Sequence, residues 1–177
     1  YIWGHSHKFS NNFFKKNVQK IIKYSKNKIF NRIYVSSYEL NENILKNIID
    51  IIIIQKPKYV LTYSSTISVL LNFLSLTNKI INNKINFITT SENLPIDDYK
   101  KFYIFFPNGL LINEYGMAET GVIGYNNPKD NYYEIINLWH DYVLQSNNNE
   151  LIITELSRKA FPLFRYTPDD QINLANS

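Results

Sequence analysis

Runs of apolar residues with helical and strand-like spacing alternate along the first two thirds of this chain. A basic, aromatic stretch at about 12–24 is helix-like. A second helix is predicted at 42–55, because Asn41 is a candidate N-cap and Pro57 stops the helix. A third begins near the candidate caps Ser64 and Ser65, and its apolar positions recur at helical spacing: Ile67, Leu70, Leu71 and Leu74.

Short strand-like runs separate these helices, at 32–37, 58–63, 85–89 and 110–113. Before the last run, Pro95 followed by Asp97 and Asp98 predicts a helix start with acids near its positive end. Strands that alternate with helices favour parallel pairing, since the helices form the crossovers. We therefore predict an α/β fold, with a mainly parallel sheet flanked by helices.

After Tyr125 the pattern becomes strand-like throughout. Asn126-Asn127-Pro128 is a turn cluster, and 147–149 is a predicted hairpin turn. Strands are expected at 132–136, 139–144, 151–156 and 161–166. The sequence thus predicts a small antiparallel β region after the parallel sheet, with parts at 1–30, 31–125 and 126–177.

Composition narrows the function classes. The 177 residues are 45% hydrophobic and 15% aromatic, which indicates a packed globule. Without cysteine, the chain has no disulfide and no thiol nucleophile, which agrees with a cytoplasmic protein. The net charge of +4 comes from scattered lysines without a nucleic-acid-binding motif, so we expect no nucleic-acid partner. The longest apolar run, broken by Asp50, is too short for membrane insertion.

Two motifs carry the candidate chemistry. The first, at 113–121, reads Asn-Glu-Tyr-Gly-Met-Ala-Glu-Thr-Gly and resembles the Tyr-Gly-x-Thr-Glu motif of adenylate-forming, AMP-binding enzymes. The second, at 161–170, is similar to the Pro-Leu-x-Arg-Tyr-x-x-x-Asp motif of the same superfamily. Stretches at 37–43, 56–65 and 89–92 are similar to its phenylacetate-CoA ligase branch, in the group associated with capsular polysaccharide biosynthesis.

The resemblance implies a ligase that uses ATP and Mg²⁺ to activate a carboxylic acid substrate as acyl-AMP, then passes the acyl group to a thiol such as CoA. It makes 31–125 the nucleotide-binding subdomain and 1–30 a remnant of the preceding one, and 126–177 would end at the ribose-binding motif. A carboxylate near the phosphates can hold Mg²⁺, so Glu119 is the implied metal ligand and catalytic residue.

The other implied site residues contact the nucleotide. Tyr115 would stack on the adenine, and Gly116 would allow close backbone approach to the ligand. A tight Tyr-Gly turn would precede Glu119. Ser91 and Glu92 would line the adenine pocket. Asp170 would accept hydrogen bonds from the ribose hydroxyls, with its neighbour Asp169 as the competing candidate.

Departures from the motifs leave a second interpretation open. Ala118 replaces the usual threonine, Asp169 replaces the usual glycine, and the chain starts at Tyr1. We expect the N-terminal phosphate-loop region and the lysine-bearing C-terminal domain of the enzyme to be missing, so the chain alone would be a non-catalytic remnant or binding module.

Two other kinds of site are disfavoured by the sequence. A hydrolase that uses His140-Asp141 would need a Gly-x-Ser-x-Gly elbow, which the chain lacks. His5 and His7 could bind a metal ion, but two ligands do not make a site.

Overall fold

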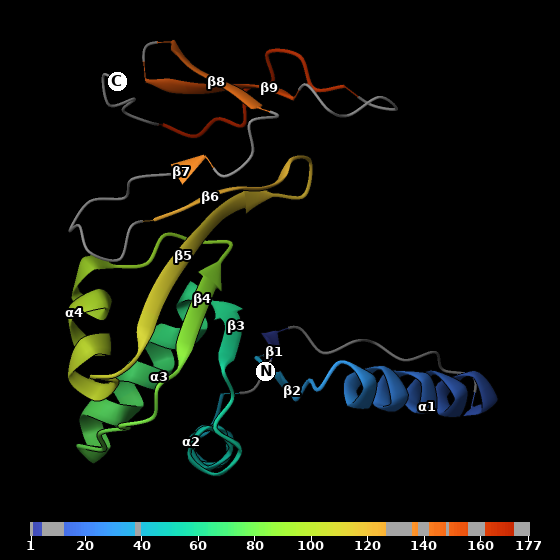
Figure 1. The fold of residues 1–177 in the computed structure, drawn as a ribbon, viewed down its shortest axis with the longest axis vertical. Helices are drawn as coiled ribbons and strands as arrows, with labels where there is room; N and C mark the ends of the chain where they lie inside the picture. Colours follow the sequence, from blue (N-terminus) through green and yellow to red (C-terminus); the bar gives the residue numbers. More distant parts are fainter. Residues whose placement is uncertain are drawn as a thin grey trace. The chain divides into compact units, whose positions relative to one another are not determined.

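The structure is a computed structural model that describes residues 2–4, 13–37, 40–126, 136–137, 142–147, 149–155 and 162–171. The chain divides into two compact units, whose strands are labelled in Figure 1. Unit 1 contains the described residues up to Glu114, and unit 2 those from Tyr115 onward. Strand β5 contributes its first residues to unit 1 and its last three to unit 2.

A parallel sheet forms the centre of unit 1. Its strands lie in the order β2–β1–β3–β4–β5, and every neighbouring pair is parallel. The strands are β1 (Ile2–Gly4), β2 (Tyr34–Ser36), β3 (Tyr59–Tyr63), β4 (Asn86–Thr90) and β5 (Leu110–Met117). This confirms the predicted parallel α/β architecture.

Four helices connect these strands: α1 (Phe13–Ile29), α2 (Glu42–Gln55), α3 (Ser64–Thr77) and α4 (Ile96–Phe105). The predicted bounds of α2 are confirmed, and its Asn41 cap accepts the N–H of Ile44 at 3.0 Å. The prediction that Ser64 caps α3 is wrong. Ser64 lies inside the helix, and its hydroxyl donates to the carbonyl of Glu92.

One face of the unit 1 sheet carries the main core. Val60, Phe87 and Leu111 are register partners on β3, β4 and β5, and all three are fully buried. They belong to the same apolar cluster as the buried side chains of α2, α3 and α4. These three helices therefore form a single layer on this face, with α3 and α4 side by side in Figure 1.

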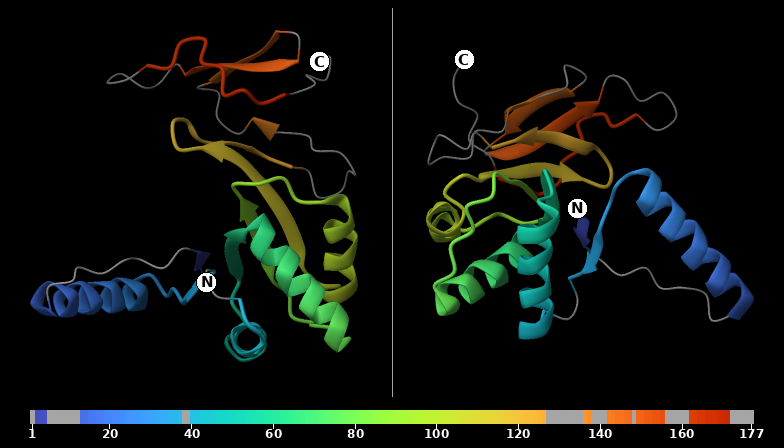
Figure 2. Two further views of the ribbon diagram at one scale, coloured as in Figure 1. Left: turned by 180° about the vertical axis from the view of Figure 1, so that it is seen from behind. Right: turned by 60° about the horizontal axis from the view of Figure 1, so that its bottom comes forward.

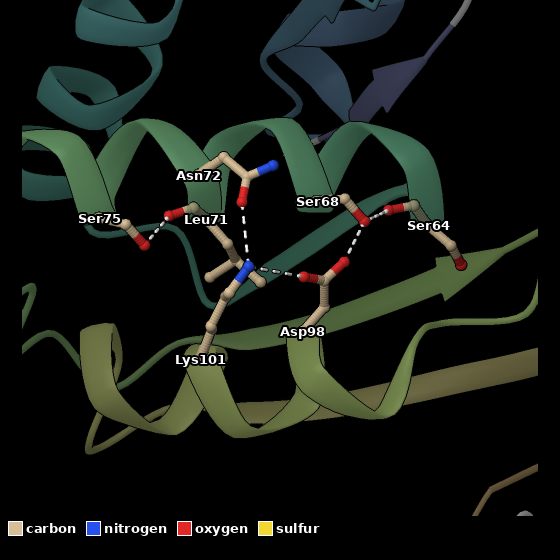
Figure 3. Close-up of polar contacts among 7 residues, drawn as sticks. All are labelled: Ser64, Ser68, Leu71, Asn72, Ser75, Asp98 and Lys101. Carbon is tan, nitrogen blue, oxygen red and sulfur yellow. Dashed lines mark hydrogen bonds and ion pairs between the residues drawn. The ribbon is translucent and has the colours of Figure 1, made fainter.

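A polar cluster joins α3 to α4 within this helix layer (Figure 3). The hydroxyl of Ser68 donates to the carboxylate of Asp98 at 2.5 Å, and Lys101 lies 3.7 Å from the same carboxylate. Lys101 also donates to the side-chain oxygen of Asn72 at 3.1 Å. Asp98 is only 6% exposed, in the first turn of α4, where the helix dipole favours a negative charge. These contacts fix how the two helices meet.

Unit 2 is antiparallel. Its strands, besides the end of β5, are β6 (Gly121–Tyr125), β7 (Ile136–Asn137), β8 (Tyr142–Asn147) and β9 (Glu150–Glu155). β6 pairs with β7, and β8 pairs with β9, which Asn149 precedes with a positive φ of 69°. The small antiparallel region predicted after the parallel sheet is thus confirmed.

The strand expected at 161–166 is wrong for its described part. Residues 162–171 form two isolated bridges to β9, Tyr166 with Ile153 and Gln171 with Glu150, but no continuous strand. Arg165 and Asp169 have φ values of 51° and 62°, which interrupt the extended backbone that a ladder requires. The strand residues expected at 132–135 and 139–141 lie outside the described part of the chain.

Candidate functional site

The two sequence motifs meet in unit 2. The phenolic hydroxyl of Tyr115, near the end of β5, donates to a carboxylate oxygen of Asp170 at 2.5 Å. Hydrogen bonds from neutral donors to a carboxylate are short and stronger than neutral pairs. Residues implied to bind adenine and ribose are therefore in direct contact, although they come from different motifs.

Main-chain hydrogen bonds hold the second motif along β9. Ile153 and Tyr166 exchange two hydrogen bonds of 2.8 Å each, and the N–H of Leu151 donates to the carbonyl of Asp170 at 2.9 Å. Leu151 and Ile153 are buried in a small apolar cluster against which Tyr115 packs. The position of the Asp170 carboxylate thus depends on pairing with β9, which no local sequence signal predicts.

The environment of Tyr115 keeps its phenol protonated. Burial raises the pKa of the Tyr115 hydroxyl well above its ordinary value, and its hydrogen bond to Asp170 raises the pKa further. The nearby phenol of Tyr166 contributes in the same direction. Sequence reasoning assigned no role to Tyr166, although it lies within the second motif. The protonated phenol can act as a donor, and the carboxylate keeps further lone pairs for other hydroxyl groups.

The close backbone approach expected at Gly116 is present, but the group that approaches it belongs to the neighbouring strand β6. A Cβ at this position would lie 2.5 Å from the carbonyl oxygen of Gly121 and 2.9 Å from the Cα of Val122. The tight Tyr-Gly turn expected from the motif is wrong. Tyr115, Gly116 and Met117 are extended in β5, and the turn follows at 118–120 because β6 pairs back against this strand.

Glu119 lies in the exposed β5–β6 turn, next to the exposed Ala118. Among the described residues, no group of three His, Cys, Asp or Glu side chains could hold a metal ion. A single exposed carboxylate still fits Mg²⁺, which commonly takes one or two carboxylates and completes its shell with water and phosphate oxygens. Glu119 would supply such a ligand and would steady the phosphates that the ion contacts.

Asp169 and Asp170 differ in backbone conformation. Asp169 has a φ of 62°, in the left-handed region that favours glycine and that Asp tolerates better than most residues. Of the two, Asp170 makes the contact with Tyr115, and its assignment to the ribose stays a prediction.

Ser91 and Glu92 belong to unit 1, in the loop after β4. Ser91 is exposed with a φ of 76°. The carboxylate of Glu92 accepts the N–H of Ser65 at 3.1 Å in the first turn of α3, where helices leave donors without partners. Asn113, to which the sequence assigned no role, donates to the Glu92 carbonyl at 3.4 Å. Glu92 therefore caps the N-terminus of α3, and its predicted contact with adenine stays a prediction.

His5, His7 and His140 lie outside the described residues. No helix in the described ranges is long and apolar enough to cross a membrane.

No protein-family profile and no curated protein matches the chain. Solved structures do resemble it. A 2-hydroxyisobutyryl-CoA ligase in complex with 2-HIB-AMP and CoA gives a TM-score of 0.59 at 9% identity, covering 94% of this chain and 41% of that one. A long-chain-fatty-acid-CoA ligase of Archaeoglobus fulgidus gives 0.57 at 16% identity, covering 93% and 36%. A luciferase-like enzyme from the mealworm Zophobas morio gives 0.56 at 13% identity, covering 94% and 41%.

These likenesses establish the fold. The chain adopts part of the fold of adenylate-forming CoA ligases, and it spans well under half the length of each of these three structures.

Proposed function

We propose that this chain is part of an ATP-dependent adenylate-forming ligase. The enzyme joins a carboxylic acid to AMP, releases pyrophosphate, and passes the acyl group to a thiol such as CoA. The observation that carries this proposal is the contact between Tyr115 and Asp170, which unites the two motifs on one small unit. The shared fold of CoA ligases supports it.

Asp170 binds the ribose in this proposal. An ionised carboxylate has about four lone-pair positions, so one bond from Tyr115 leaves room for two ribose hydroxyls. Tyr115 holds the carboxylate in place and presents its ring beside the sugar and base. Mg²⁺, held by Glu119 and the phosphates, would neutralise charge on the triphosphate. By the same resemblance, Ser91 and Glu92 contribute to adenine binding.

The finer parts of the proposal come from the sequence. Membership of the phenylacetate-CoA ligase branch, in the group associated with capsular polysaccharide biosynthesis, comes from the sequence resemblance. A cytoplasmic location is proposed because the chain has no cysteine, and no nucleic-acid partner because its lysines are scattered and lie in no binding motif. The alternative is a non-catalytic binding module with the same fold. Ala118 favours this alternative, because its exposed methyl group cannot donate a hydrogen bond to a phosphate oxygen.

Nucleotide binding to the 177-residue chain tests the ribose assignment. Calorimetric titration compares AMP with 2′,3′-dideoxy-AMP on the parent chain, Asp170→Asn and Asp169→Asn. We expect Asp170→Asn to weaken AMP binding at least tenfold and to abolish the preference for the ribose hydroxyls, because the loss of even one charged hydrogen bond costs about 1.5–3 kcal/mol. Asp169→Asn is the matched control and should bind like the parent. Equal effects of the two substitutions would contradict the assignment.

Catalysis is tested separately from binding. We expect the 177-residue chain to show no appreciable carboxylate-dependent exchange of labelled pyrophosphate into ATP. The binding-module alternative predicts AMP binding without exchange in any longer protein that contains this chain. The ligase proposal predicts exchange there, with a loss of about 10²–10³ in rate on Glu119→Ala.

A further inference from the structure

Among the described residues, no helix packs on the second face of the unit 1 sheet. Leu61, Ile88 and Ile112 are register partners on β3, β4 and β5, one residue after the buried row of Val60, Phe87 and Leu111. Successive residues of a strand point to opposite faces, so this row lies on the other side. Leu61 is 37% exposed, and Ile88 and Ile112 are only partly buried. Parallel sheets are almost always covered on both faces, so a covering layer is expected on this face.

Helix α1 carries an apolar stripe that is exposed in the described part of the chain. Val18, Ile21, Ile22 and Ile29 are spaced to fall on one side of the helix. Their exposed fractions are large, 65% for Ile21 and 77% for Ile29. Lys20 falls on the opposite side of the helix. In both views of Figure 2, α1 extends beside the strands of unit 1 and does not lie across them.

The order of the strands assigns a face to α1. The connections β2–β3, β3–β4 and β4–β5 all step in one direction across the sheet, and their helices α2, α3 and α4 share one face. The connection β1–α1–β2 steps in the opposite direction between parallel strands. Crossovers of this kind are right-handed in about 98% of cases, so a step in the opposite direction places its helix on the opposite face.

We propose that α1 of the same chain docks on the open face of the unit 1 sheet, with its apolar stripe over Leu61, Ile88 and Ile112. Both ends of α1 already lead into strands of this sheet, and residues 30–33 form a connection of ordinary length to β2. The ammonium of Lys23 lies 4.1 Å from the ring centre of Tyr34, the first residue of β2, so docking extends an existing contact. Docking leaves Lys20 in solvent.

The dimensions agree with this arrangement. A helix of 17 residues is about 25 Å long, and five strands span roughly 19 Å. With α1 docked, the neighbouring strands β1 and β3 send their connections to opposite faces. Their carboxyl ends, at Gly4 and Tyr63, then form the kind of crevice in which open α/β sheets bind ligands.

Cross-linking tests the docked position directly, because the chain has no native cysteine. Ile21→Cys with Ile88→Cys is treated with a short bis-maleimide, and Lys20→Cys with Ile88→Cys is the matched control. We expect the first pair to give a linked monomer at a yield that does not depend on protein concentration, and at least several times the control yield. Equal yields, no linkage, or linked dimers that increase with concentration would overturn the proposal, the last by showing that a second copy supplies the helix.

A second measurement covers the case in which a cysteine pair disturbs folding. Ile22→Asn is compared with Lys20→Asn by urea unfolding. If α1 docks, the urea midpoint of Ile22→Asn should lie about 0.5 M below that of the parent, because the sheet buries this side chain. The midpoint of Lys20→Asn should match that of the parent, because Lys20 stays in solvent. Equal midpoints would mean that the stripe of α1 stays in solvent and would overturn the proposal.

Discussion

The hydroxyl of Tyr115 lies 2.5 Å from a carboxylate oxygen of Asp170, 55 residues further along the chain. Tyr115 is on β5 and Asp170 follows a segment that pairs with β9, so this one hydrogen bond ties together the β5 end and the β9 side of unit 2. It also joins the two motifs on which the proposed function depends.

Loss of the Tyr115 hydroxyl should loosen this connection. Tyr115→Phe keeps the ring over the small apolar cluster and removes the donor to Asp170. We expect the free energy of unfolding to fall by about 0.5–1 kcal/mol, since the carboxylate is exposed and water replaces part of the bond. Urea unfolding measures the change. Tyr59→Phe, which also keeps its ring, is the control and should leave the midpoint in place.

Alkaline pH should weaken unit 2 through the same phenol. The folded-state pKa of Tyr115 is raised above its ordinary value of 10.0 by burial and by Asp170. The unfolded chain therefore loses this proton first, and the stability that Tyr115 contributes below pH 10 declines as the pH rises further. Unfolding midpoints measured from pH 8 to 11 should fall more steeply for the parent chain than for Tyr115→Phe. Parallel curves would refute the assignment.

Gly116 should tolerate no side chain. In Gly116→Ala the new Cβ would meet the Gly121 carbonyl at 2.5 Å, so the β5–β6 pair must shift, at a cost of about 1–3 kcal/mol. Gly121 has a φ of 71° and open space around it. Gly121→Asn should therefore cost less than Gly116→Ala, because Asn adopts this conformation readily. Thermal unfolding of both variants ranks the two costs, and the reverse order would contradict the close approach.

The polar cluster between α3 and α4 should depend on Asp98. Asp98→Ala leaves the Ser68 hydroxyl and Lys101 without their buried acceptor, so we expect a loss of about 1–3 kcal/mol in unfolding free energy. Asp97→Ala, at the exposed neighbouring position, should cost much less. A cycle with Ser68→Ala isolates the pair, and additive losses would show that Ser68 and Asp98 are not coupled.

Glu119 should act on metal-dependent binding and not on folding. Its side chain is exposed in the β5–β6 turn, so Glu119→Gln should leave the urea midpoint unchanged. We expect the gain in ATP affinity on adding Mg²⁺ to shrink several-fold in this variant, because the amide is a weaker ligand than the carboxylate. Calorimetric titrations of ATP with and without Mg²⁺ measure this gain. An unchanged gain would place the metal ligand elsewhere.

Local signals in the sequence were sufficient for much of unit 1. Asn41 and Pro57 set the bounds of α2, because a cap and a helix breaker act within a few residues of where they stand. The alternation of strands and helices implied parallel pairing, since parallel strands need crossovers. The superfamily resemblance rests on motif residues that the sequence displays without any fold.

Only the tertiary structure decided where distant residues meet. The Tyr-Gly pair looked like a turn, yet β5 continues through it because β6 supplies hydrogen-bond partners that lie later in the chain. Residues 161–166 looked like a strand, but the described part only bridges β9. The contact of Tyr115 with Asp170 depends on that bridging register. Propensity and spacing act over a few residues, whereas register comes from the whole set of burial and hydrogen-bond energies that the folded chain satisfies together.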